Sequence, residues 1–200
     1  MELERKYGLT IKYIQDEYAE NPREDMDNLC EMICFHSRYK LGDKHVYRLE
    51  QLEEMVKSKD YLSLPLFLYD HSGITMKTAP FPCLWDSGQV GYIIVSKEKI
   101  RKEYSVKRVT NKVREKVYDL MRAEVSEYDG FISGQVYGYV IEDEDGNSLD
   151  SCWGYLCGNK EGEEYLRNEA RNAAKRCAEE LSEKKAKEFL TDNEPELLQA

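Results

Sequence analysis

The chain alternates between apolar runs and polar segments in an order that predicts both strands and helices. Two apolar runs, Leu64–Tyr69 and Val90–Val95, predict buried strands joined by a long loop that contains proline, glycine and aspartate. Loops between core strands often carry functional side chains, because a rigid scaffold holds them in place. We therefore expect function near this loop or on the acidic surface around it.

Two segments nearer the N-terminus also predict strands. Leu9–Tyr18 alternates in part between apolar and polar positions. Leu29–Tyr39 places apolar side chains on both faces of an extended chain, a pattern typical of a strand that is buried on both sides. Residues 1–8 are charged and lack such a pattern, so we expect them to be loose.

A hairpin is predicted in the second half of the chain. Gln135–Ile141 and Ser148–Leu156 have the pattern of strands, and the Asp-Gly dipeptide at 145–146 favours a tight turn between them. Gly138 and Gly154 lie inside these strands, where glycine indicates a bulge or a close approach of the backbone.

Three segments between these strands predict helices. His45–Ser58 has apolar residues at helical spacing and should pack on the sheet as an amphipathic helix. Ser96 can cap a short helix over Lys97–Tyr104. Thr110 can cap a longer helix that ends before Gly130.

The C-terminal part predicts one long helix over residues 161–193. Pro195 should limit it, which leaves residues 194–200 loose. No repeat or linker interrupts the chain, so we predict a single α+β domain over residues 1–200, with a mostly antiparallel sheet and helices packed against it. The buried stripe of the long helix should consist of Leu166, Ala170, Ala173, Cys177 and Leu181.

Composition narrows the class of protein. The 200 residues carry 39 acidic and 29 basic side chains, a net charge of −10. Proteins that bind nucleic acid directly are usually basic, so this charge favours plain solubility or a basic partner surface. No apolar run is long enough to span a membrane and the N-terminus does not resemble a signal peptide, so we expect a cytoplasmic protein with reduced thiols.

Zinc binding is the first chemistry to consider, because the chain has six cysteines. Cys30, Cys34 and His36 could bind zinc together with thiols elsewhere in the chain. On a strand, however, Cys30 and Cys34 lie about 13 Å apart along the axis, which does not suit zinc ligands. Free cysteines often pack in cores as small apolar residues, so we expect no metal and no cofactor.

Nucleophilic catalysis is the second possibility. Cys83 or Ser87 could be activated by His36 or His71. Neither residue lies in a sequence frame typical of a catalytic nucleophile, so the sequence favours structural roles for both.

A carboxylate site is the third possibility. Asp70 and Asp86 lie at the expected ends of the two core strands, with His71 beside the first. Together with Asp27 and Asp43, they could bind a divalent metal ion, as carboxylates do in hydrolases that act on phosphate esters. Aspartate at the end of a strand is also a common turn former.

The charged segments suggest interaction surfaces. Residues 97–114 are basic, but the glutamates among them indicate an ordinary solvated helix surface. Tyr137 and Tyr139 lie near an acidic cluster and could anchor a partner protein. Carboxylates in such a cluster can occupy a basic groove in place of a phosphate backbone, or merely keep the protein soluble. The cluster consists of Glu142, Asp143, Glu144 and Asp145.

Several longer blocks carry a resemblance to known proteins. They are ENPRE at 20–24 followed by Asp27-Asn28, CFHSRYKLGD at 34–43, LPLFLYDHSGI at 64–74, PFPCLWDSGQVGY at 80–92 and DSCWG at 150–154. Together they resemble an uncharacterised family of small proteins encoded by bacteriophages, plasmids and other mobile elements, over about residues 10–158. Small acidic proteins of mobile elements often inhibit host defences, and the resemblance implies that genomic setting without an assigned activity.

Three hypotheses follow for the function. The first is a mobile-element accessory protein, not an enzyme, that inhibits a host defence nuclease of the CRISPR or restriction type. It would bind a basic, nucleic-acid-binding effector through the acidic cluster and the last helix, in the cytoplasm of a bacterial host. The alternative is a metal-dependent hydrolase that acts on nucleotides or nucleic acid through Asp70, His71 and Asp86. A third hypothesis is an interaction module in phage replication.

Overall fold

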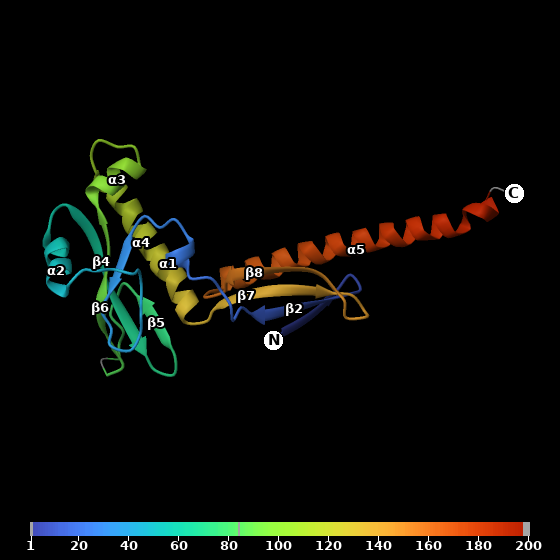
Figure 1. Cartoon of the computed structure of the whole chain (residues 1–200), viewed down its shortest axis with the longest axis horizontal. Coiled ribbons are helices and arrows are strands. Elements are labelled where there is room, and N and C mark those ends of the chain that lie inside the picture. Colours follow the sequence, from blue (N-terminus) through green and yellow to red (C-terminus); the bar gives the residue numbers. More distant parts are fainter. Residues whose placement is uncertain (1, 84, 198–200) are drawn as a thin grey trace. The chain divides into compact units, whose positions relative to one another are not determined.

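The computed structural model describes residues 2–83 and 85–197, and the side chains of these residues up to position 188. This part of the chain has five helices and eight strands, and the strands form two antiparallel sheets (Figure 1), which confirms the predicted α+β class. The elements are, in chain order, β1 (Glu2–Lys6), β2 (Leu9–Gln15), α1 (Pro22–Asp25), β3 (Glu31–Cys34), α2 (Leu49–Lys57), β4 (Tyr61–Asp70), β5 (Ile74–Lys77), β6 (Ser87–Ser96), α3 (Lys97–Glu103), α4 (Asn111–Ile132), β7 (Val136–Glu142), β8 (Ser148–Leu156) and α5 (Lys160–Leu197).

The chain forms two compact units. Unit 1 consists of Met1–Ala19 and Gln135–Ala200, and unit 2 of Glu20–Gly134. Each unit has its own four-stranded sheet and its own buried apolar residues. The sequence pattern predicts one domain, whereas the first and last segments of the chain come together in unit 1 because β2 pairs with the distant β7.

The sheet of unit 1 has the strand order β1-β2-β7-β8 and is apolar on one face. Leu9, Ile11 and Tyr13 of β2 are buried and alternate with half-exposed residues, as the period of a strand requires. Four of the five residues predicted for the stripe of the C-terminal helix are buried and Leu181 is partly buried, and α5 covers this face through a row of mostly small side chains. The buried residues of α5 are Leu166, Ala170, Ala173, Ala174 and Cys177.

Both ends of unit 1 differ from the prediction. The sequence predicts that residues 1–8 are loose, whereas residues 2–6 form β1, which pairs with β2. Tyr7 and Gly8 connect these strands with φ values of 57° and 77°, the left-handed region that suits a two-residue hairpin turn. At the other end, α5 continues to Leu197. It therefore passes Pro195, although proline removes one backbone hydrogen bond and its ring crowds the carbonyl four residues earlier.

β7 and β8 form the predicted hairpin. The predicted bulge is also confirmed, because the register of the two strands shifts beside Gly138, and Gly154 opposite it has a φ of 84°. A Cβ atom at Gly138 would lie 2.4 Å from the ring of Trp153, so only glycine lets this ring rest on the strand.

The sheet of unit 2 has the order β3-β6-β4-β5 and is covered by helices on both faces (Figure 1). On one face, Leu52 of α2 packs with Ile33 and Ile94. This arrangement confirms that the strand predicted over Leu29–Tyr39 is buried on both sides, although β3 itself ends at Cys34. The other face is covered by the apolar side of α4, which buries Val117, Met121, Val125 and Tyr128.

Unit 2 contains a strand that the apolar pattern missed. Residues 74–77 form β5 at the edge of the sheet, after a turn in which Ser72 has a φ of 58°. The carboxylate of Asp129 in α4 accepts hydrogen bonds from the backbone amide of Met76 at 2.6 Å and from the hydroxyl of Thr75 at 2.8 Å. These bonds compensate for the few apolar residues of this short strand.

The helix caps of unit 2 follow the sequence closely. Ser96 and Thr110 cap α3 and α4 as predicted, and each side-chain oxygen accepts a backbone amide three residues further on. The end of α4 differs from the prediction, because Gly130 lies inside the helix and is buried. The helix stops after Ile132, where Gly134 takes a φ of 69°.

Candidate functional site

The residues of the predicted hydrolase site come together in unit 2. β4 ends at Asp70 and β6 begins at Ser87, and antiparallel pairing brings these two ends side by side. The backbone amide of Asp70 donates a hydrogen bond of 2.8 Å to the carbonyl of Asp86. Nδ1 of His71 lies 3.2 Å from a carboxylate oxygen of Asp86. The strand ends predicted from the sequence therefore placed these three residues correctly as neighbours.

The loop after β3 contributes two residues that the sequence analysis missed. The guanidinium of Arg38 forms an ion pair with the carboxylate of Asp70, and the hydroxyl of Tyr39 donates to the same carboxylate at 3.3 Å. The ring of His36 stacks on that of Tyr39, with 5.1 Å between their centroids. Asp70 therefore already has a cationic partner and a hydroxyl donor.

The geometry of this cluster does not match a nucleophilic site or a metal site. The hydroxyl of Ser87 donates to the carbonyl oxygen of Cys83, so it is not directed at a histidine. The thiol of Cys83 lies 3.7 Å from the carboxylate of Asp86. Throughout residues 2–83 and 85–188, no three His, Cys, Asp or Glu side chains are arranged to hold a metal ion. The interactions instead connect three neighbouring loops.

The cysteines of the candidate zinc site belong to the core of unit 2. Cys30 and Cys34 are both buried among apolar residues. Burial raises the pKa of Cys34 to about 12 and raises the pKa of Cys30 as well. Because zinc binds the thiolate form, two thiols that stay protonated at neutral pH suit core packing better than metal binding.

A buried ionic cluster is the strongest electrostatic feature of unit 2. The side chain of Arg23 is only 1% exposed and donates to both carboxylate oxygens of Asp43, each at 2.8 Å. It also donates to Glu124 at 2.9 Å and to the carbonyl of Cys30 at 2.7 Å. Burial lowers the pKa of Arg23, but the hydrogen bonds to the two carboxylates outweigh it and raise the pKa above its ordinary value. Asp43, a candidate metal ligand in the sequence, therefore has a structural role.

The four acids of the β7–β8 turn have two different roles. Glu142 forms an ion pair of 2.6 Å with Lys12 of β2. Asp143 accepts hydrogen bonds from the side chain and the backbone amide of Asn147, and these bonds lower its pKa. Glu142 therefore connects β7 to β2, and Asp143 stabilises the turn. Glu144 and Asp145 are exposed at its tip, where they can meet a partner.

The two tyrosines predicted as partner anchors differ in exposure. Tyr139 is 4% exposed, lies on the face of the sheet that α5 covers, and contacts the ring of Tyr155. It is therefore a core residue and not an exposed anchor, because the period of the strand places it on the same face as Ile141. Tyr137 is half-buried and lines a pocket.

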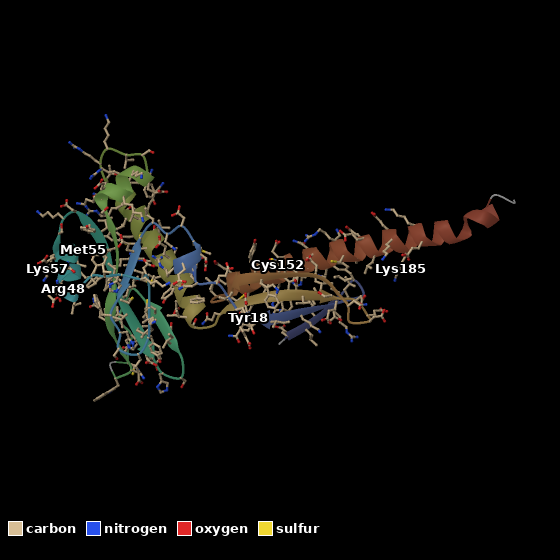
Figure 2. The ribbon with its side chains drawn as sticks, viewed as in Figure 1. Tyr18, Arg48, Met55, Lys57, Cys152 and Lys185 are labelled. Atoms are coloured by element: carbon tan, nitrogen blue, oxygen red, sulfur yellow. The ribbon has the colours of Figure 1, made fainter. Side chains whose placement is uncertain are left out.

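The acidic charge of the chain is concentrated in unit 1. Unit 1 has 20 acidic and 11 basic side chains, a net charge of −9, and unit 2 has 19 and 18, a net charge of −1. Residues 135–159, which contain the β7–β8 hairpin, have five acidic side chains and no lysine or arginine. The part of α5 whose side chains are described is not acidic, because residues 160–188 carry eight acids and eight bases. Lys185 lies on the stretch of α5 that extends beyond the strands (Figure 2).

Unit 1 also contains a pocket of about 590 Å³ beside the N-terminal part of α5. The guanidinium of Arg167 forms an ion pair of 2.5 Å with Glu2 and lies over the ring of Tyr13, 4.9 Å from its centroid. This pocket could not be predicted from the sequence, because its walls come from segments far apart in the chain. It is lined by Glu2, Tyr13, Gln135, Tyr137, Cys157, Gly158, Glu163, Leu166 and Arg167.

Comparison of the chain with protein-family models, with curated proteins and with solved structures finds no match. Among the described residues, no helix has both the length and the apolar composition needed to cross a membrane.

Proposed function

We propose that this protein is a binding protein, not an enzyme, that docks through the acidic β7–β8 hairpin onto the basic nucleic-acid groove of a host defence nuclease and inhibits it. The partner would be a CRISPR or restriction effector in the cytoplasm of a bacterial cell, in line with the resemblance to mobile-element proteins. One observation carries the proposal. The hairpin segment, residues 135–159, has five carboxylates and no cationic side chain.

The hairpin has features that suit docking. β8 is an edge strand of the sheet, and residues 151–154 in it are exposed. The exposed carboxylates of Glu144 and Asp145 lie on a turn that the hydrogen bonds of Asp143 hold in one conformation. Carboxylates held on a rigid turn attract a positively charged groove over a distance and, on contact, determine how the two proteins are aligned.

Charge reversal at the tip tests the proposal. Glu144→Lys with Asp145→Lys should reduce inhibition at least tenfold, because the tip would then repel a basic groove. The matched control, Glu50→Lys with Glu54→Lys on α2 of unit 2, changes the net charge equally at exposed positions and should inhibit normally. Plating of phage on a strain with an active defence system gives the inhibition. Co-purification of the effector at rising salt gives the binding.

Two results would contradict the proposal. Normal inhibition by the tip variant would show that the hairpin does not bind the effector. Equal loss in the tip variant and in the α2 control would show that only net charge matters.

The second candidate function is a hydrolase that acts on nucleotides or nucleic acid. It is favoured by one observation, the proximity of Asp70, His71 and Asp86 at the ends of β4 and β6. The ion pair between Arg38 and Asp70 opposes it, because it occupies the carboxylate that would act as base or ligand. Incubation of the purified protein with nucleotides and with single- and double-stranded nucleic acid tests it. This function requires turnover that Asp70→Asn and His71→Ala both abolish.

A further inference from the structure

We infer that the pocket of unit 1 receives an arginine side chain of the basic partner. The inference rests on the proposed function and adds a specific anchor point to it. Arginine side chains that fill a pocket on the other molecule often contribute much of the binding energy of an interface.

The size and walls of the pocket suit a long side chain. Its volume of about 590 Å³ lies within the range of pockets that bind small molecules. Tyr13 and Tyr137 lie on neighbouring strands and on the same face of the sheet, so they give the pocket aromatic walls. Leu166 is buried and provides an apolar contact for the methylene groups of an arginine.

The charges of the pocket favour a cation. Two carboxylates and one guanidinium line it, so its formal charge is −1. The guanidinium of Arg167 already forms an ion pair with Glu2. Among the described residues, Glu163 has no ion-pair partner, so its carboxylate is available to an entering cation. An anionic ligand would meet this carboxylate together with a guanidinium that is already paired.

The pocket also shows how a guanidinium can be held. Arg167 lies over the ring of Tyr13 at 4.9 Å, a cation–π contact made within this chain. Tyr137 offers a second ring to an arginine that enters from outside. The side-chain oxygen of Gln135 lies next to Gly158: a Cβ atom at Gly158 would be 2.8 Å from this oxygen. The oxygen can accept a hydrogen bond. The donors of a guanidinium thus find a carboxylate and an amide oxygen.

The remaining lining residue, Cys157, stays uncharged in this setting. Burial raises the pKa of its thiol, and the negative charge of Glu163 raises it further. The thiol is therefore an apolar contact at neutral pH and does not add a second anion to the pocket.

An NMR titration of the full-length protein with N-acetyl-arginine amide tests the inference. We expect saturable shifts in the amide signals of Tyr137, Cys157 and Leu166. Glu163→Gln should weaken the affinity about fivefold to tenfold, because it removes a charged hydrogen-bond acceptor. Glu164→Gln is the matched control, since it lies next on α5, is exposed and does not line the pocket. It should change the affinity less than twofold.

Three outcomes would overturn the inference. They are no saturable binding of the arginine probe, equal effects of Glu163→Gln and Glu164→Gln, and tighter binding of N-acetyl-glutamate amide than of the arginine probe.

The inhibition assay separates the pocket from the proposed function. If the Glu144/Asp145 reversal abolishes inhibition while Glu163→Gln leaves it unchanged, the pocket is not an anchor and the proposed function stands. If the Glu144/Asp145 reversal leaves inhibition intact, the proposed function fails, whatever the arginine probe shows.

Discussion

The two units use ionisable side chains in opposite ways. Unit 2 is almost neutral and buries a guanidinium between two carboxylates, at Arg23, Asp43 and Glu124. Unit 1 carries nearly all of the net charge and keeps it at the surface, where Glu2 pairs with Arg167 on α5. A buried ionic cluster allows few alternative packings, because a misplaced partner would leave an unpaired charge in the core. Surface carboxylates cost little to maintain and are available to a partner.

The cores of the two units also differ in how much of each sheet the helices cover. The sheet of unit 2 is covered by α2 on one face and α4 on the other. In unit 1, α5 covers one face of the sheet and packs there through alanines. Unit 2 therefore has the larger share of buried apolar residues, and unit 1 the larger share of exposed strand. This contrast is in line with the proposal that the binding surface belongs to unit 1.

Breaking the buried ionic cluster should have the largest effect. Arg23→Met leaves the buried Glu124 and the partly buried Asp43 without their cation, and we expect the free energy of unfolding of unit 2 to fall by about 3–5 kcal/mol. Arg122→Met is the matched control on α4, where the arginine side chain is 55% exposed, and should cost less than about 0.5 kcal/mol. Urea unfolding, with hydrogen exchange of the Met32 amide as the probe of unit 2, measures both. Similar losses in the two variants would contradict the role of the cluster.

A methyl group added at the bulge of unit 1 should have an intermediate effect. In Gly138→Ala, the new Cβ would meet the ring of Trp153 and the backbone of β8, and we expect a loss of about 2 kcal/mol. Gly88→Ala in unit 2 is the control, because its Cβ meets no atom within 4 Å. Fluorescence of Trp153 in a Trp85→Phe background reports unit 1, since Trp85 is 97% exposed and its replacement should be tolerated. Hydrogen exchange of the Met32 amide reports the control in unit 2. An unchanged unfolding midpoint in Gly138→Ala would show that the ring moves aside freely.

The smallest expected effect concerns the response of unit 1 to pH. Burial and the hydrogen bond to Glu4 raise the pKa of Tyr13 to about 12, from about 10 in an unfolded chain. Between these values the unfolded chain loses the phenolic proton and the folded chain keeps it, so stability falls as pH rises from about 10 to about 12. Tyr13→Phe keeps the ring and removes the proton, and should make this decline shallower.

Tyr18→Phe is the control for this measurement, because the Tyr18 side chain (labelled in Figure 2) is 92% exposed. The free energy of unfolding of each variant at pH 9 and at pH 11 gives the comparison. If Tyr13→Phe loses as much stability as the Tyr18→Phe control, burial of the Tyr13 hydroxyl does not contribute to the alkaline response.

The strands and sites that the sequence missed share a physical cause. β1 is charged and forms because β2 accepts and donates the hydrogen bonds of its backbone. β5 is short and forms because the carboxylate of Asp129 accepts a hydrogen bond from its backbone. The proximity of Asp70 and Asp86 could be predicted, because both follow from the ends of two strong apolar runs. The contact of Arg38 with Asp70 could not, since it depends on how the loop after β3 lies against the sheet.

Local patterns determined the α+β class, the helix caps at Ser96 and Thr110, the β7–β8 hairpin and the absence of cationic side chains from it. These features depend on hydrogen bonds, turns and charges within a few residues, which the order of amino acids specifies directly. Only the tertiary structure decided the division into two units, the burial of Arg23 and Tyr139, and the pocket beside α5. Each of these depends on pairing between distant segments, above all β2 with β7, whose energy comes from the packing of the whole core.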